Sequence, residues 1–340
     1  MLPPCPIVVV IPCYRVKDKI MTVLARIPAY VESVICVDDA CPEQSGLFVK
    51  ERCADPRVTV LFHDCNRGVG GAMVTGYRAA LEKEETSIIV KIDGDGQMDP
   101  DLIQAFIVPI LRGQCDYTKG NRFFHPEDLQ GMPVLRVLGN GVLSFLTKLS
   151  AGYWDIFDPT NGYTAIHSAV LRCIPLDKVA PSYFFESDML FRLNIARAVV
   201  RDIPVKSVYE DETSSLQIHR IIGPFLTKHG HNFMKRVGYN YFLRDFHIAS
   251  LELFFGTLCM LFGLIFGLVK WHHSNLTGVP VTAGTVMLSS LPFLMGFQMI
   301  LAFLQFDIQS VPRYPLVVNE KDAEFNAWLY TEEVLTASIG

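Results

Sequence analysis

The sequence predicts an α/β fold with a mostly parallel central sheet, followed by a membrane hairpin. Short apolar runs alternate with amphipathic helical runs before residue 213. This alternation is typical of parallel sheets covered by helices. Two much longer apolar runs lie near the C-terminal end, within a chain of 50% hydrophobic residues and mean hydropathy +0.28. These observations together predict a folded domain attached to a bilayer.

Each strand of the predicted sheet is a run of β-branched and apolar residues, and each helix follows the 3.6-residue periodicity. The strands are expected at 7–12, 33–39, 58–62, 88–93, 162–167 and 203–210. The helices are expected at 18–29, 70–83, 100–112, 135–150 and 187–200. Right-handed crossovers would connect the parallel strands. The carboxyl ends of these strands would then face one crevice, where open α/β sheets bind ligands.

The two apolar runs predict a transmembrane hairpin. Residues 248–269 carry one charge, Glu252, and residues 279–306 carry none, and about 20 apolar residues suffice to span a bilayer. The connecting loop holds only Lys270, whereas cations flank the outer ends of the hairpin, at Lys235, Arg236, Arg244 and Arg313. Because cytoplasmic loops are rich in Lys and Arg, both chain ends are expected in the cytoplasm and the hairpin in the inner (plasma) membrane.

Four segments therefore divide the chain. Residues 1–212 form the α/β domain, 213–245 a basic stretch, 246–308 the hairpin and 309–340 a cytoplasmic tail. The basic stretch has no acid between Gln217 and Arg244 and interleaves cations with aromatic residues. This pattern favours interfacial helices on an anionic leaflet. A solvated helical linker is the alternative.

Composition disfavours several function classes. The N-terminus has no basic region or cleavage site of a signal peptide. Nine scattered cysteines without a C-x-x-C pair support neither a zinc site nor a disulfide framework. The net charge of −5 argues against nucleic-acid binding. The first predicted strand is followed by "IPCYRVKD", without the glycines of a dinucleotide fold, which disfavours a dehydrogenase.

The stretch "KIDGDGQMDP" at 91–100 predicts a metal site. Asp93 and Asp95 follow a buried strand, and Gln97 adds a neutral oxygen. Hard oxygen ligands suit Mg²⁺ or Mn²⁺, which use few carboxylates when a substrate diphosphate completes the shell. An Asp- and Gly-rich surface turn is the alternative. An EF-hand is excluded, because the twelfth loop position is Gln104 instead of glutamate.

Two further polar segments follow predicted strands. Asp38 and Asp39 would accept hydrogen bonds from a base or ribose, or else form an Asx-turn or helix cap. The glycine-rich "NRGVGGAMVTGYRAAL" opens a helix, so that its backbone N–H groups and Arg67 would face an anion.

These motifs, in this order, resemble glycosyltransferase family 2 enzymes of GT-A fold. The resemblance covers about residues 6–245 and is strongest to dolichol- or polyprenyl-phosphate sugar transferases, with a hairpin like that of the bacterial members. It is carried by "IPCYR", "VICVDDACPEQSG", "NRGVGGAMVTGY", "IIVKIDGDGQMDP", "YTKGNRF", "DPTNGYTAIH", "YFFESDML" and "YEDETSSL".

The resemblance implies a role for each matching position. The nucleotide would contact Pro12, Tyr14 and Asp39, with Asp38 beside them, and Arg67 of the glycine-rich turn and Asp93 complete the predicted donor site. The metal would bind Asp93, Asp95 and Gln97. Arg122 would approach the diphosphate or the acceptor phosphate, and Glu186 and Asp188 would lie near the reacting sugar. Asn161 and Gly162 stand where the family usually has Ser-Gly, which leaves the sugar open. Asp188 replaces the glutamate of several relatives.

The expected activity is inverting, metal-dependent transfer from a UDP- or GDP-sugar to a polyprenyl phosphate at the cytoplasmic membrane face. A lipid phosphate is mostly ionised at pH 7, so Asp188 would orient a substrate without removing a proton. The lipid phosphate would meet Arg220, Lys228, Lys235 and Arg236. A same-fold transferase acting on a sugar hydroxyl and a non-enzymatic nucleotide-sugar binding protein are the alternatives. Homo-oligomers are left open.

Overall fold

The computed structural model describes residues 5–83, 87–124, 134–206 and 218–317, without the side chains of 134–136 and 218–222. The chain divides into two compact units. The first runs to Asn232 and takes in the segment that begins at Pro312, and the second is Phe233–Val311. This division falls inside the predicted basic stretch, and the predicted boundary at residue 212 lies outside the described residues.

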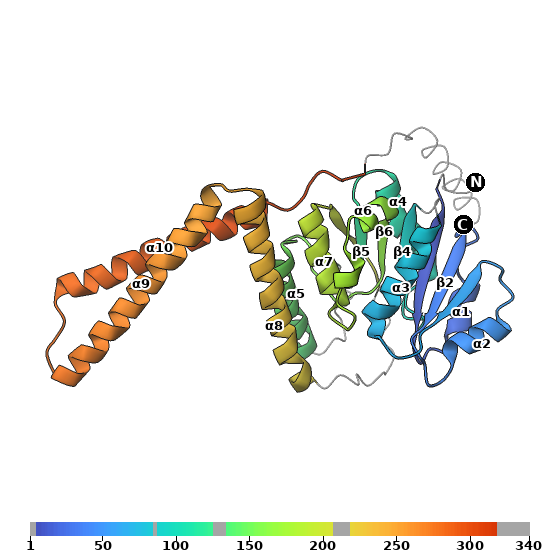
Figure 1. Cartoon of the computed structure of the whole chain (residues 1–340), viewed down its shortest axis with the longest axis horizontal. Helices are drawn as coiled ribbons and strands as arrows, with labels where there is room; N and C mark the ends of the chain where they lie inside the picture. Colours follow the sequence, from blue (N-terminus) through green and yellow to red (C-terminus); the bar gives the residue numbers. More distant parts are fainter. Residues whose placement is uncertain (1–4, 84–86, 125–133, 207–217, 318–340) are drawn as a thin grey trace. The chain divides into compact units, whose positions relative to one another are not determined.

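The first unit is built on one twisted sheet (Figure 1). In the described part of the chain, its strands stand in the order β3-β2-β1-β4-β6-β5-β7. Only β6 runs antiparallel to its neighbours, β4 and β5. The predicted mostly parallel α/β sheet is therefore confirmed. The strands are β1 (Ile7–Cys13), β2 (Ser33–Asp38), β3 (Val58–Phe62), β4 (Ile88–Lys91), β5 (Tyr117–Asn121), β6 (Thr164–His167) and β7 (Val200–Pro204).

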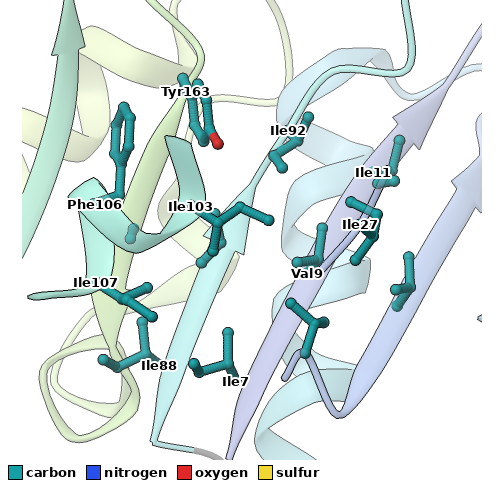
Figure 2. Packing of buried hydrophobic residues seen from close by; sticks show 14 of the residues in the cluster. Ile7, Val9, Ile11, Ile27, Ile88, Ile92, Ile103, Phe106, Ile107 and Tyr163 are labelled. Carbon is teal, nitrogen blue, oxygen red and sulfur yellow. The ribbon is translucent and has the colours of Figure 1, made fainter. Parts of the chain in front are cut away.

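Helices cover both faces of this sheet, because the central strands are apolar on both sides. Alternate residues of β1 point to opposite faces: Ile7, Val9 and Ile11 join a core with α1, α2 and α4. Figure 2 shows this core, where Phe106 stacks on Tyr163 with ring centroids 4.0 Å apart. Val10 instead meets α3 at Gly76, where an added Cβ would collide.

The helices begin and end where local chemistry dictates. For example, the Asp99 side chain accepts a hydrogen bond from Asp101 N (3.1 Å), and Pro100 starts the following 3₁₀ turn, which suits a residue without an N–H. The helices of the first unit are α1 (Ile20–Ala25), α2 (Ser45–Arg52), α3 (Gly68–Glu82), η1 (Pro100–Leu102), α4 (Ile103–Leu111), α5 (Val134–Ala151), α6 (Ser168–Arg172), η3 (Leu176–Lys178), α7 (Phe185–Ala196) and most of α8 (Ile218–Val237).

Several elements differ from expectation, and the short helix α6 and the 3₁₀ turn η3 were not predicted. Strand β5 was not predicted, because its sequence "YTKGN" is polar, yet all five residues are buried. Helix α2 was missed because its apolar residues follow no clear helical period. Strand β7 begins three residues before the predicted strand at 203–210, and residues from 207 onward lie outside the described part. The early start follows from its pairing, in which Tyr117 of β5 lies opposite Val200.

The second unit contains the π-helical segment η4 (Gly238–Arg244) and the long helices α9 (Ile248–Thr277) and α10 (Ala283–Gln309). Both long helices have the length and composition of membrane spans, with mean hydropathies of 2.1 and 1.8. Small residues let them approach closely. An added Cβ on Gly256 would lie 3.0 Å from Gly296 O, and Ser289 Oγ donates to Gly263 O at 2.8 Å.

A buried ion pair lies where α8 and α10 end. Arg236 donates to both carboxylate oxygens of Asp307, at 2.6 and 2.9 Å, and Tyr241 donates to the same group at 2.6 Å. Arg236 is 2% exposed. Arg236, one of four cations predicted to meet a lipid phosphate, is therefore enclosed inside the second unit.

Candidate active site

Five of the predicted motifs converge at one edge of the sheet. Strands β1, β2, β4 and β5 run in the same direction, so their carboxyl ends share this edge, and antiparallel β6 begins there. The edge therefore collects the residues after β1, β2, β4 and β5 and the turn before β6. These are Pro12 to Arg15, Asp38 and Asp39, Asp93 to Gln97, Arg122, and Asn161 with Gly162.

Asp93 and Asp95 offer carboxylate oxygens at the end of β4. Gln97 is exposed, and its backbone N–H donates to Asp95 Oδ1 at 3.0 Å. A Cβ added to Gly162 would lie 2.9 Å from Asp93 Oδ2, so glycine keeps this oxygen uncrowded. No group of three or more His, Cys, Asp or Glu side chains suitable for a metal occurs in the described ranges. Two hard carboxylates fit Mg²⁺ or Mn²⁺ when phosphates and water complete the shell.

A buried lysine stands between two of the acids at this edge. Lys91 Nζ lies 3.2 Å from Asp93 Oδ1 and 3.1 Å from Glu186 Oε1, and its side chain is 1% exposed. Burial alone would lower the pKa of Lys91, but the two carboxylates more than offset burial and raise it above its ordinary value. Glu186 is thereby brought to the same place as Asp93, although 93 residues separate them in the chain.

Asp38 and Asp39 are both buried and bonded to backbone groups. Asp38 accepts from Cys41 N at 2.7 Å and Gly46 N at 2.6 Å, and so holds the loop before α2. Asp39 accepts from Arg67 N at 2.8 Å and Gly68 N at 2.7 Å, and so holds the start of α3. These are the turn and cap contacts that the sequence left open as the alternative. Their direct contact with a nucleotide stays a prediction.

Asp39 also orients a histidine that sequence reasoning missed. His63 Nδ1 lies 2.7 Å from Asp39 Oδ1, and His63 Nε2 lies 2.8 Å from Thr75 Oγ1 in α3. The chain of contacts ties β2, β3 and α3 together beneath the glycine-rich turn. The turn that was predicted to face an anion is therefore rigidly supported.

The ends of β1 and β2 are strained. Arg15 and Ala40 have positive φ, 57° and 52°, in a region that non-glycine residues seldom occupy and that is enriched near functional sites. Tyr14, next to Arg15, is 42% exposed and its ring lies 5.5 Å from the Arg15 guanidinium. Pro12 pairs with Val37 within the sheet. An exposed ring at a strand end is available for stacking on a base.

Arg122 is held by a buried acid from "DPTNG". Its guanidinium contacts both oxygens of Asp158, at 2.7 and 3.0 Å, and Thr160 Oγ1 at 3.2 Å. Lys119 Nζ donates to the backbone oxygen of Asn161 in the same segment, and burial lowers the pKa of Lys119 to about 8. The turn before β6 is thus fixed by two cations from β5 and its end.

Asp188 lies on another side of α7 from Glu186. Its Oδ2 accepts from Ala180 N and Arg192 Nε, both at 2.9 Å, and its Oδ1 accepts from Asn232 Nδ2 at 3.1 Å. The side chain is buried. The structure therefore brings Glu186, and not Asp188, into contact with the Asp93 cluster.

The remaining predicted cations are dispersed. Exposed Arg67 lines a hollow of about 490 Å³ between α3 and residues 176–181. Lys228 is exposed, 3.4 Å from Ser182 Oγ and 5.6 Å from the Phe184 ring centre. Lys235 is exposed. Arg220 is in the first turn of α8, whose side chains lie outside the described residues.

Sequence reasoning missed Lys91, Lys119, Asp158 and Asn232. One signal was present for Lys91, because a lone lysine in the apolar run "IIVKI" needs a buried partner. Lys119 and Asp158 stand inside quoted motifs, but their partners are 42 and 36 residues distant. Nothing in the sequence marks Asn232.

Curated relatives align with about two thirds of this chain. One is the UDP-N-acetylglucosamine–dolichyl-phosphate N-acetylglucosaminyltransferase of Methanococcus voltae, 28% identical over 231 residues, which cover 64% of this chain and 91% of the relative. Another is the undecaprenyl-phosphate mannosyltransferase of Micrococcus luteus, 28% identical over 221 residues, covering 64% and 89%.

Solved structures show the same fold. Glucosyl-3-phosphoglycerate synthase from Mycobacterium tuberculosis, in complex with Mn²⁺, UDP and glucosyl-3-phosphoglycerate, superposes with a TM-score of 0.52 at 16% identity, over 69% of this chain and 81% of the synthase. The sheet described above is therefore a GT-A sheet. The family profile of Glycosyl transferase family 2 matches residues 8–174, a range that includes β1 to β6 and the acids after β4. With its fold, its acidic strand ends and these relatives in agreement, the chain belongs to glycosyl transferase family 2.

Proposed function

We propose that this glycosyltransferase transfers a sugar, with inversion, from a UDP- or GDP-sugar to a polyprenyl phosphate at the cytoplasmic face of a membrane. The observation that carries the proposal is the order of parts: a GT-A sheet with acids after β4, then the basic helix α8, then two helices long enough to span a bilayer. Relatives that act on dolichyl and undecaprenyl phosphate support this choice of acceptor.

The donor would lie along the strand-end edge. Tyr14 would stack on the base, the backbone N–H groups at the start of α3 would face phosphate, and Asp93 and Asp95 would hold Mg²⁺ or Mn²⁺. A metal bound there would offset charge on the departing nucleoside diphosphate. Glu186 and Arg122 would border the sugar, because Glu186 shares Lys91 with Asp93 and Arg122 is fixed at the end of β5.

A lipid phosphate acceptor suits a site in which Asp188 is committed to the protein. In the proposed step, a phosphate oxygen attacks the anomeric carbon, and the bond to the nucleoside diphosphate breaks as the new bond forms. Since the phosphate is already ionised near neutral pH, no proton has to be removed. Asp188 is fully engaged by Ala180, Arg192 and Asn232. A hydroxyl acceptor would instead need a base, and nothing observed favours that alternative.

The acceptor would be met by the cations of α8. Lys228 and Lys235 are exposed and precede the first apolar helix, and Lys and Arg near a span attract anionic headgroups. Arg236 is omitted from this set, because its guanidinium is committed to Asp307. Arg220 remains a candidate by sequence.

The test is a screen of radiolabelled UDP- and GDP-sugars against polyprenyl phosphate, with membranes that contain the chain. We expect label to enter an organic-extractable lipid from one donor, and none with Asp95→Asn membranes. A lipid product that is labile to mild acid would identify a phosphate-linked sugar. Transfer only to a saccharide hydroxyl, with polyprenyl phosphate inert, would reject the proposal.

A further inference from the structure

The buried ammonium of Lys91 is the unassigned group closest to the reacting edge. It is the last residue of β4, and Asp93 follows two positions later in the chain. Its charge is shared between Asp93 Oδ1 at 3.2 Å and Glu186 Oε1 at 3.1 Å. Within the described residues, Asp93 Oδ1 is buried without a hydrogen-bond partner, so the ion pair with Lys91 is what compensates this oxygen.

The turn before β6 closes over this ammonium. A Cβ at position 162 would lie 2.9 Å from Asp93 Oδ2 and nearer still to Lys91 Nζ. The register places Lys91 opposite Thr164, two residues after Gly162. Lys91 is thus confined by a strand, a helix and a turn that each belong to a different family motif, and its side chain is 1% exposed.

Lys91 lowers the negative charge beside the predicted metal ligands. Counted together, the carboxylates of Asp93, Asp95 and Glu186 and the ammonium of Lys91 have a net charge of −2, which equals in magnitude the charge of one divalent cation. Without Lys91 the charge would be −3, and the partly buried carboxylates of Asp93 and Glu186 would repel each other. The Lys91 ammonium contacts Oδ1 of Asp93, and the other oxygen, Oδ2, lies beside Gly162.

We propose that Lys91 is a positioning residue for sugar transfer, which fixes the carboxylates of Asp93 and Glu186 and matches the charge of the site to one divalent cation. This inference rests on the proposed function. It assigns Lys91 no contact with substrate. Its effect on the reaction is exerted through the orientation of Asp93 and Glu186.

The experiment measures Mn²⁺ binding and catalysis separately, on the full chain in detergent. Lys91→Met removes the charge and keeps most of the volume. Mn²⁺ is added without donor or acceptor, and the EPR signal of free Mn²⁺ reports how much is bound. We expect Lys91→Met to bind Mn²⁺ at least about tenfold more tightly than the wild type, because a nearby positive charge has been lost. We expect kcat to fall at least about tenfold, since Asp93 loses its orientation. Lys91→Arg, which keeps the charge, should restore Mn²⁺ affinity to within threefold (a threshold of roughly 0.6 kcal/mol).

Matched variants separate positioning from stability. Lys119→Met is the control, because Lys119 is also a buried lysine opposite Thr164 but donates to a backbone oxygen instead of an acid. This variant should destabilise the fold without tightening Mn²⁺ binding. An Asp93→Asn, Asp95→Asn double variant sets the background for Mn²⁺ bound elsewhere. If Lys91→Met fails to fold, Gly162→Ala supplies the test, because it displaces the ammonium with all charges kept and should lower kcat.

Two results would overturn the proposal: Mn²⁺ affinity in Lys91→Met that is unchanged or weaker, or a wild-type kcat in both Lys91→Met and Gly162→Ala. Mn²⁺ titration needs neither donor nor acceptor. A chain that transfers no sugar to polyprenyl phosphate would therefore fail the proposed function, while the effect of Lys91 on the metal site would still be measured.

Discussion

Asn232 of α8 donates a hydrogen bond to Asp188 of α7, with Nδ2 3.1 Å from Oδ1. Two residues before Asp188 on the same helix, Glu186 contacts Lys91, which contacts Asp93. The first turns of α7 therefore connect the acidic edge of the sheet to the basic helix that leads toward the apolar pair. Asp188, which was expected to orient a substrate, instead joins α7 to α8 within the protein.

The first prediction concerns Asp188→Asn. The change removes a charge that compensates Arg192 and one acceptor, so the free energy of unfolding should fall by about 2 kcal/mol. The dependence of kcat/KM on pH near neutrality should keep its shape, because Asp188 takes no proton in the proposed reaction. Asn232→Ala removes the same contact from the α8 side. This variant should raise KM for polyprenyl phosphate. An acidic limb of the profile that disappears in Asp188→Asn would instead identify a general base.

The second prediction concerns the metal carboxylates. Asp95→Asn should lower the transfer rate roughly 100-fold or more, since an amide cannot offset the metal's charge and several kcal/mol of stabilisation are lost. Asp101→Asn is the matched control, because Asp101 is exposed and pairs with Arg26 at 2.7 Å; its rate should stay near wild type. Full activity of the wild type in excess EDTA would contradict the metal assignment.

The third prediction concerns pH and the docking of α8. His229 is buried, with Nδ1 2.7 Å from Ser150 Oγ, and burial lowers its pKa to about 4 from the ordinary 6.5. Between these values the unfolded chain binds a proton that the folded chain does not, so stability falls as pH drops from 6.5 toward 4. Thermal unfolding at pH 7.5 and 5 should show a smaller loss of Tm in His229→Phe than in wild type.

The control for that measurement is His231→Gln, which changes an exposed histidine on the same helix. This variant should keep the pH dependence of the wild type. Identical acid sensitivity in wild type and His229→Phe would show that His229 does not contribute to the loss.

The fourth prediction concerns topology. The cations flanking the hairpin predict that the loop between α9 and α10 faces away from the cytoplasm. Asn275 lies in the last turn of α9, directly before this loop, and an Asn275→Cys variant in intact cells should react with a membrane-impermeant maleimide. The exposed Cys65 and Cys173 of the first unit provide an internal control, since they should react only after lysis. Labelling of Asn275→Cys that requires lysis would place the loop in the cytoplasm.

The sequence by itself determined the fold class, the resemblance to the family and the edge of the sheet at which the polar motifs gather. Strands β1, β2 and β4 are buried on both faces, so their apolar runs are continuous and hard to mistake. Acids placed directly after such runs have to lie at the carboxyl edge of the sheet. The two apolar helices were equally plain, because their apolar runs are long enough to span a bilayer.

Tertiary structure alone decided which polar groups are available to ligands and which are committed to the protein. "YTKGN" became a buried strand because β6 and β7 pair with it on either side. Lys91 met Glu186, Arg236 met Asp307 and Asp188 met Asn232 across 95, 71 and 44 residues of sequence. The sequence does not reveal which group a charged side chain will contact. Burial of a charge is unfavourable unless the fold brings an opposite charge or a hydrogen-bonding group within about 3 Å of it, and only the tertiary structure determines those distances.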